Sequence, residues 1–69
     1  MKGLPLDSSI LKSVSYDAHR RVLIVTFHNR SVYEYIGVPE DIFRDLLDAR
    51  SKGKFFHEYI LGVYEAKRV

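Results

Sequence analysis

Two runs rich in β-branched and aromatic residues, 20–28 and 32–36, flank a polar break at residues 29–31. The second run alternates its side chains with the two-residue period of a β-strand. Asn29 tolerates the left-handed backbone conformation that a short hairpin loop needs, whereas Arg30 stands where the tightest turns have glycine. The pattern predicts a β-hairpin that the rest of the chain covers.

A further strand is predicted at residues 10–16, and residues 17–19 form the turn that leads into the hairpin. The strand at 20–28 is apolar on both faces, although the exposed face of an antiparallel sheet is normally polar. Because two helices cover only one face, a second copy of the chain is expected to cover the other. Sheet packing and exchange of the C-terminal helix both stay open as routes to this homodimer. The expected dimer interface consists of Val22, Ile24, Val32, Ile36, Phe55 and Phe56.

The second half of the chain has the pattern of two helices. Proline and two acids at residues 38–41 suit the start of a helix and the positive end of its dipole. An apolar stripe follows, and Gly53 in the turn 51–54 is expected to stop this helix. A second helix is predicted at about 54–61, ending near Gly62. Its core-facing residues are Phe55, Phe56, Tyr59 and Ile60.

These elements predict an α+β fold in which a three-stranded antiparallel meander precedes two helices (βββαα), with the chain expected to be dimeric. Residues 1–9 are expected to form a flexible N-terminal lead-in, because Leu4-Pro5 disfavours helix and residues 7–9 form a polar turn. Residues 10–64 form a single domain. Residues 65–69 are expected to be a frayed basic C-terminal tail.

The composition fits one small domain that needs an extra source of stability. A domain of about 60 residues buries only about 60% of its unfolded surface. The 69 residues include no cysteine for disulfides or zinc, so oligomerisation is favoured. No signal peptide is visible, and no run approaches the roughly 20 apolar residues that span a bilayer. We therefore expect a cytoplasmic protein without a membrane partner.

The distribution of charge is more informative than the net charge of +2. The acids concentrate in the first predicted helix, where residues 38–49 include four acids and one base. The segments before and after this helix are both positive. Such a division can steer a polyanion toward the basic segments. The alternative is that these charges only keep a small protein soluble.

No arrangement of residues predicts an enzyme or a cofactor site. The three histidines, His19, His28 and His57, have no metal-ligand spacing, and neither a phosphate-binding loop nor a nucleophile motif is present. His57 lies beside two phenylalanines, and a structural histidine is favoured there over a ligand-binding one. We therefore expect no catalytic activity, no cofactor, no metal and no small-molecule substrate, and the role of His57 stays open.

The turn at residues 51–54 is the strongest candidate for binding phosphate. Backbone amides at a helix start, a glycine and two lysines suit a phosphate contact, although a simple turn with solvated lysines fits equally well. Two strand tyrosines on one face offer stacking surfaces, but core packing is favoured for them. The predicted nucleic-acid-binding residues are Lys52, Lys54, Arg20, Arg21, Arg30, Arg50, Tyr33 and Tyr35.

An ordered set of residues runs through most of the chain: Val14-Ser15-Tyr16-Asp17, Leu23-x-Val25-x-Phe27, Tyr33-x-Tyr35, Val38-Pro39 and Ser51-x-Gly53-x-Phe55-Phe56. From about Ser8 to Tyr64 the chain thereby resembles the KTSC domain family, found at the C-terminus of some lysyl-tRNA synthetases and as small stand-alone bacterial proteins. His57 and Arg30 depart from the more usual asparagine and glycine. The resemblance implies a small nucleic-acid-binding module and supplies no catalytic residues.

The sequence therefore predicts a non-enzymatic protein that binds RNA or DNA through phosphates with low sequence specificity. The alternative function is a protein–protein interaction module that uses the apolar outer face of the sheet, formed by Val22, Ile24, Val32 and Ile36.

Overall fold

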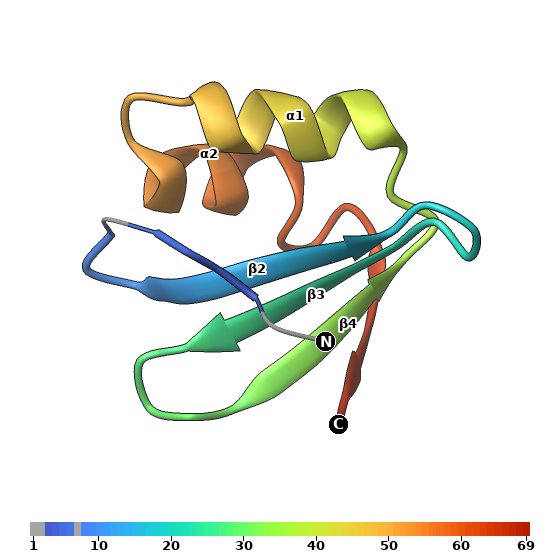
Figure 1. The fold of residues 1–69 in the computed structure, drawn as a ribbon, viewed down its shortest axis with the longest axis horizontal. Coiled ribbons are helices and arrows are strands. Elements are labelled where there is room, and N and C mark those ends of the chain that lie inside the picture. The colour runs from blue at the N-terminus through green and yellow to red at the C-terminus, as the bar shows by residue number, and fades with distance from the viewer. Residues whose placement is uncertain (1–2, 7) are drawn as a thin grey trace.

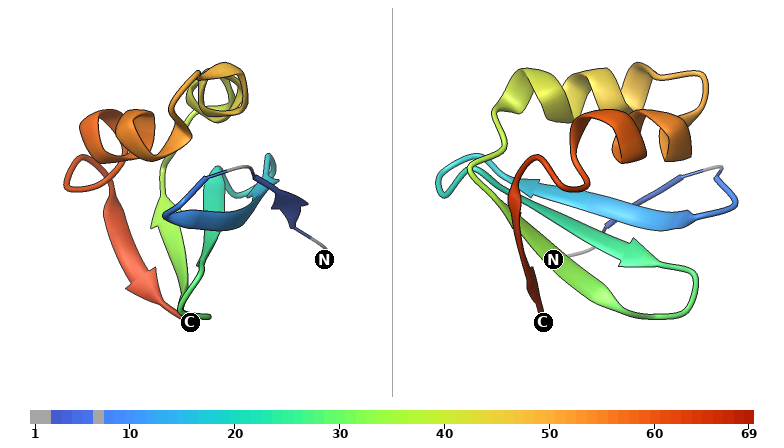
Figure 2. Two further views of the ribbon diagram at one scale, coloured as in Figure 1. Left: turned by 90° about the vertical axis from the view of Figure 1, so that its left-hand side faces the viewer. Right: turned by 180° about the vertical axis from the view of Figure 1, so that it is seen from behind.

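A computed structural model describes residues 3–6 and 8–69. Five strands form one antiparallel sheet in the order β1-β2-β3-β4-β5, and two helices lie together on one face of it (Figures 1 and 2). The elements are β1 (Leu4–Pro5), β2 (Leu11–Asp17), β3 (Val22–Phe27), β4 (Val32–Ile36), α1 (Glu40–Asp48), α2 (Lys52–Tyr59) and β5 (Glu65–Arg68).

The predicted three-stranded meander is wrong, because the sheet has five strands, although the α+β class is confirmed. β1 lies in the predicted lead-in, of which residues 1–2 and 7 are outside the described residues. β5 lies in the predicted frayed tail, where it pairs with β4, and the Val69 amide donates to the Val32 carbonyl at 2.9 Å. Neither segment is long enough or apolar enough to show a strand period, since each adds to an existing strand through its backbone.

The central hairpin is confirmed, and β4 has the predicted bounds Val32–Ile36. The Phe27 amide donates to the Ser31 carbonyl at 2.9 Å and closes the loop. Arg30, with φ of 72°, is the residue in the left-handed conformation, whereas Asn29 was expected to take it. The Asn29 carboxamide oxygen instead accepts from the Ser31 amide at 3.0 Å, in the manner of an Asx turn.

The core lies between the helices and the face of the sheet that they cover. Alternate positions of β2, β3 and β4 point toward the helices, and the helices present their apolar stripes in return. Tyr35 packs edge-on against Phe56 with ring centroids 5.4 Å apart, which joins the sheet to α2. The buried core residues are Leu11, Val14, Leu23, Val25, Tyr35, Val38, Leu46, Phe56 and Ile60.

The turn between the helices differs from the prediction. α1 ends at Asp48, with Ala49 in an extended conformation, so Gly53 is not the residue that stops it. Gly53 is buried in the first turn of α2, which starts two residues earlier than predicted. The Ser51 hydroxyl accepts from the Lys54 amide at 3.3 Å and caps this helix. Neither helix is long and apolar enough to cross a membrane, as judged over the described residues.

Candidate nucleic-acid interface

Three segments that are far apart in the sequence meet at one end of the molecule (Figure 1). A Cβ placed on Gly53 would lie 3.2 Å from Ile10 Cδ1 and 3.6 Å from Ser8 Oγ, so the start of α2 packs directly on residues 8–10. The Nε2 of His28 lies 2.7 Å from the carbonyl oxygen of Ser8, which ties the hairpin to the same segment. The loop between the helices, the start of β2 and the β3–β4 hairpin therefore form one surface.

Most basic groups on this surface are exposed and free of ion pairs. We define the cationic end as Lys12, Arg30, Arg50 and Lys54, all of which are exposed. The ion pairs found among the described residues involve none of the four. Asp48, in the last turn of α1, is the acidic neighbour of this surface. Cations with no competing partner are available to an anionic ligand.

The acids of α1 are spread along the helix, and only Asp48 lies in the turn next to the cationic end. Glu40, Asp41, Asp45 and Asp48 are exposed along this helix, and Glu40 pairs with Arg44 at 2.6 Å. The first two lie at the opposite end of α1 from the loop that joins α2. A polyanion that approaches the cationic end therefore meets little of the acidic surface of α1.

Lys52, a predicted primary phosphate contact, is already engaged. Its Nζ donates to the carbonyl oxygen of Ala49 at 2.9 Å, and the side chain is half-buried. The ammonium thus satisfies a carbonyl at the C-terminal end of α1, where a cation also complements the helix dipole. Lys54, two residues later, is exposed and points to solvent.

Gly53 has a different role from the expected approach of a phosphate. Its α-carbon faces Ile10 and Ser8, so the missing side chain makes room for the segment before β2. That segment covers the start of α2 from one side. A phosphate can therefore reach the cationic side chains around this contact, but not the backbone amides at Gly53.

Arg20 and Arg21 are not brought to the cationic end. They lie in the turn between β2 and β3, at the opposite end of the sheet (Figure 1). Arg20 lies 3.9 Å from a Glu34 carboxylate oxygen, and the Arg21 carbonyl accepts from the amides of Gly37 and Val38. The predicted cationic residues therefore divide into two groups. Arg30, Arg50 and Lys54 lie at the cationic end, whereas Arg20 and Arg21 lie at the opposite end of the sheet.

The two predicted stacking tyrosines belong to the helix-covered face. Tyr35 is only 2% exposed, so it offers no stacking surface in this fold. Burial, followed by the proximity of Tyr33, raises the pKa of Tyr35 above its ordinary value. Tyr33 is half-buried and packs edge-on against Phe27, with ring centroids 5.8 Å apart. These rings stabilise the core, and the expectation of stacking by Tyr35 is wrong.

The residues of the expected dimer interface divide between the two faces of the sheet. Phe56 is 3% exposed in the core, and Phe55 is half-buried beside Tyr59, so neither forms an open contact surface. The outer face is not covered by the helices (Figure 2). There Val22 is buried within the sheet, while its apolar neighbours remain half-exposed. These half-exposed residues are Ile24, Val32 and Ile36.

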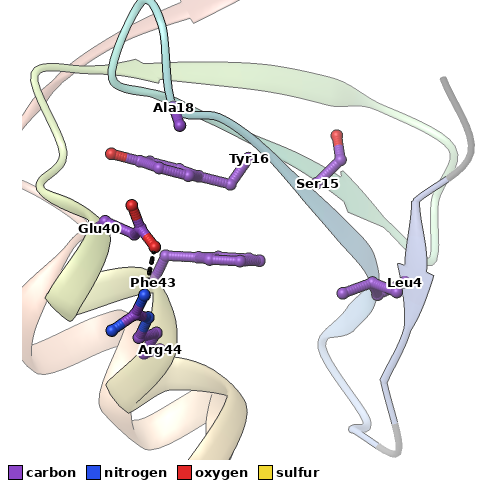
Figure 3. Close-up of a pocket in the computed structure, with 7 residues that line it drawn as sticks. All are labelled: Leu4, Ser15, Tyr16, Ala18, Glu40, Phe43 and Arg44. Carbon is purple, nitrogen blue, oxygen red and sulfur yellow. Dashed lines mark hydrogen bonds and ion pairs between the residues drawn. The ribbon is translucent and has the colours of Figure 1, made fainter.

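Sequence reasoning missed a pocket of about 330 Å³ between β2 and α1 (Figure 3). Tyr16 and Phe43 lie parallel on its wall, with ring centroids 5.0 Å apart. The Tyr16 hydroxyl donates to the Val38 carbonyl at 2.6 Å, and burial raises the pKa of Tyr16. In the sequence, Tyr16 belongs to a predicted strand and Phe43 to the apolar stripe of a predicted helix, and neither position indicates a pocket. The residues that line the pocket are Leu4, Ser15, Tyr16, Ala18, Glu40, Phe43 and Arg44.

The charged residues that line the pocket are paired with each other. Its one pair of charged groups, Glu40 and Arg44, neutralise one another at 2.6 Å. His57 is exposed on α2 and does not line the pocket. Among the described residues, no group of three His, Cys, Asp or Glu side chains is placed to hold a metal ion. The cationic end is therefore the surface whose chemistry points most clearly to a ligand class.

Comparison with known proteins gives the family. The family model of the KTSC domain matches residues 7–64. The chain belongs to the KTSC domain family. A crystal structure of a KTSC domain protein from Yersinia pestis superposes with a TM-score of 0.95 at 34% identity, covering 99% of this chain and 96% of that one.

KTSC relatives occur both as small proteins and within larger ones. An uncharacterized protein of Stutzerimonas stutzeri is 38% identical over 58 residues, covering 84% of this chain and 82% of that protein. A lysine–tRNA ligase of Nostoc punctiforme is 35% identical over 63 residues, which are 91% of this chain. The match covers only 11% of that ligase, so the similarity concerns one segment of a much longer protein.

Proposed function

We propose that this KTSC domain is a non-enzymatic nucleic-acid-binding module that contacts phosphates with low sequence specificity. The cationic end carries the proposal, because it gathers exposed basic groups from three separate segments while Lys52 and Arg20 are engaged elsewhere. Exposed lysine and arginine side chains contact phosphate oxygens and do not read base identity there. A cytoplasmic location, where nucleic acid is plentiful, fits this function.

The relatives supply a reason to test RNA first. Several of them are lysine–tRNA ligases, enzymes named for a reaction that involves tRNA. The matched segment is a small part of each ligase, and a binding segment attached to a larger enzyme is a reasonable role for it. We therefore expect RNA to bind at least as well as duplex DNA.

The first experiment measures fluorescence anisotropy of labelled single-stranded RNA and duplex DNA at about 50 and about 200 mM salt. Phosphate binding releases counterions, so the affinity is expected to fall steeply between the two concentrations. Different RNA sequences should bind with similar affinity. If neither nucleic acid binds at the lower salt concentration, the proposal fails and a protein partner for the outer sheet face becomes the better hypothesis.

A pair of matched variants tests the location of the site. Arg30→Asn with Lys54→Gln removes two charges from the cationic end, and asparagine suits the left-handed conformation of residue 30. Arg20→Gln with Arg44→Gln removes two charges elsewhere. The first pair is expected to lower the salt dependence by about one unit of slope per lost contact. Equal losses of affinity in both double variants would show that binding depends on net charge alone and not on the cationic end.

A further inference from the structure

β5 forms an open edge of the sheet. Its one neighbour among the described residues is β4, and all four of its residues are exposed. Figure 2 shows that neither helix covers its far side. An open edge strand presents unpaired backbone groups that can pair with another strand. The sequence of this edge, Glu65-Ala66-Lys67-Arg68, decides which strand fits it.

The pairing with β4 fixes which backbone groups of β5 point outward. The Val69 amide donates to the Val32 carbonyl at 2.9 Å, and Lys67 lies opposite Glu34 two positions along. In an antiparallel ladder, alternate residues direct both backbone groups to the same neighbour. Glu65, Lys67 and Val69 therefore face β4, while the amide and carbonyl groups of Ala66 and Arg68 face outward.

A second copy can join this edge antiparallel about a twofold axis in four registers that match outward groups, one for each β5 residue on the axis. Besides the register that sets Arg68 opposite the partner's Arg68, three remain. One register places Lys67 opposite the partner's Lys67, and another places Glu65 opposite the partner's Glu65. The third places Ala66 on the axis and sets Glu65 opposite the partner's Lys67 twice. Like charges directly opposite one another destabilise a strand pair, whereas opposite charges stabilise it. The charges of β5 therefore select the third register.

We propose that two copies of this chain associate through β5, with Ala66 on the twofold axis and two Glu65–Lys67 ion pairs between the copies. The two five-stranded sheets then become one continuous sheet. This interface differs from packing of the outer faces, and it does not depend on the proposed nucleic-acid binding.

Exposed apolar residues beside β5 support the same register. Val63 and Val69 are 60% and 74% exposed, and they flank β5 on its two sides. Continuing the register beyond β5 brings Val63 of one copy toward the partner's Val69. Tyr59 and Leu61, at the end of α2 and in the connection to β5, are also about half exposed. Dimerisation through β5 would shield apolar surface that the single copy leaves in water.

Two charge reversals test the ion pairs by sedimentation equilibrium. Glu65→Lys and Lys67→Glu each turn both contacts repulsive, so each variant alone is expected to dimerise at least about tenfold more weakly than the unaltered chain. Mixed in equal amounts, they restore both attractive contacts, and a heterodimer is expected at the original affinity. Circular dichroism of each variant checks that the fold is retained.

Glu58→Lys is the matched control, because it reverses an exposed charge on α2 without touching β5. It should leave the dimer dissociation constant within about twofold of the original. The proposal is overturned if the unaltered chain is monomeric at millimolar concentration. It is also overturned if a dimer survives both single reversals, or if the mixture fails to recover the lost affinity.

Discussion

Replacing Tyr16 with phenylalanine tests the contact that joins the first half of the sheet to α1. The hydroxyl of Tyr16 donates to the carbonyl of Val38 at 2.6 Å, and Val38 itself is fully buried. Phenylalanine keeps the ring that lies parallel to Phe43, with centroids 5.0 Å apart. The substitution therefore removes one hydrogen bond and little else.

The expected loss follows from leaving a buried carbonyl without its donor. Such a loss costs about 1–2 kcal/mol of unfolding free energy. For a domain of this size, about 1 kcal/mol shifts the melting temperature by roughly 4–8 °C. We therefore expect Tyr16→Phe to melt roughly 5–15 °C below the unaltered chain. Urea titration should show a lower midpoint with an unchanged slope.

The same residue makes stability depend on alkaline pH. Burial raises the pKa of Tyr16 above its ordinary value of 10.0; the charge of Arg21 opposes this shift, and the carboxylates of Glu40 and Asp41 add to it. The phenol therefore holds its proton to higher pH in the folded chain than in the unfolded chain. Its contribution to stability is complete below about pH 10 and is lost as the pH rises through the raised pKa. Tyr16→Phe should therefore reduce the loss of stability at alkaline pH. The loss that remains is expected from Tyr35, whose pKa is also raised.

Tyr59→Phe provides the matched control, because the Tyr59 side chain is 52% exposed on α2. It should change the unfolding free energy by less than about 0.5 kcal/mol. If Tyr16→Phe is as stable as this control, and its stability declines above pH 10 as before, the reasoning about the Val38 hydrogen bond is refuted.

Three further substitutions test the core, a helix end and the hairpin by thermal melting. Leu46→Ala removes a fully buried side chain, and the expected cost of about 2–5 kcal/mol should leave much of the protein unfolded at 37 °C. Gly62→Ala meets no atom within 4 Å, but a φ of 79° strains alanine, so a loss of about 1–2 kcal/mol is expected. Arg30→Gly relieves the same strain at φ of 72° and should raise stability by up to about 1 kcal/mol. Unchanged melting temperatures would contradict each expectation.

The elements that could be predicted are those whose apolar side chains are buried on one face, because that burial produces a periodic pattern in the sequence. β3 and β4 alternate or are apolar because one face meets the helices, and α1 has a clear start and stripe. β1 and β5 pack no side chain into the core, and their residues are exposed. They join the sheet through backbone hydrogen bonds, which every residue type except proline can donate. A pattern of side chains therefore carries no signal for them.

The candidate site shows the same limit for charge. The sequence identifies Arg30, Arg50 and Lys54 as basic, but their grouping depends on contacts of uncharged atoms: Gly53 against Ile10, and His28 against the Ser8 carbonyl. Arg20 is apart from them because it lies in the β2–β3 turn at the other end of the sheet. Lys52 leaves the set because a helix carbonyl competes for it. A cationic surface is thus a property of packing, and packing places it where neither the net charge nor its distribution along the chain predicts it.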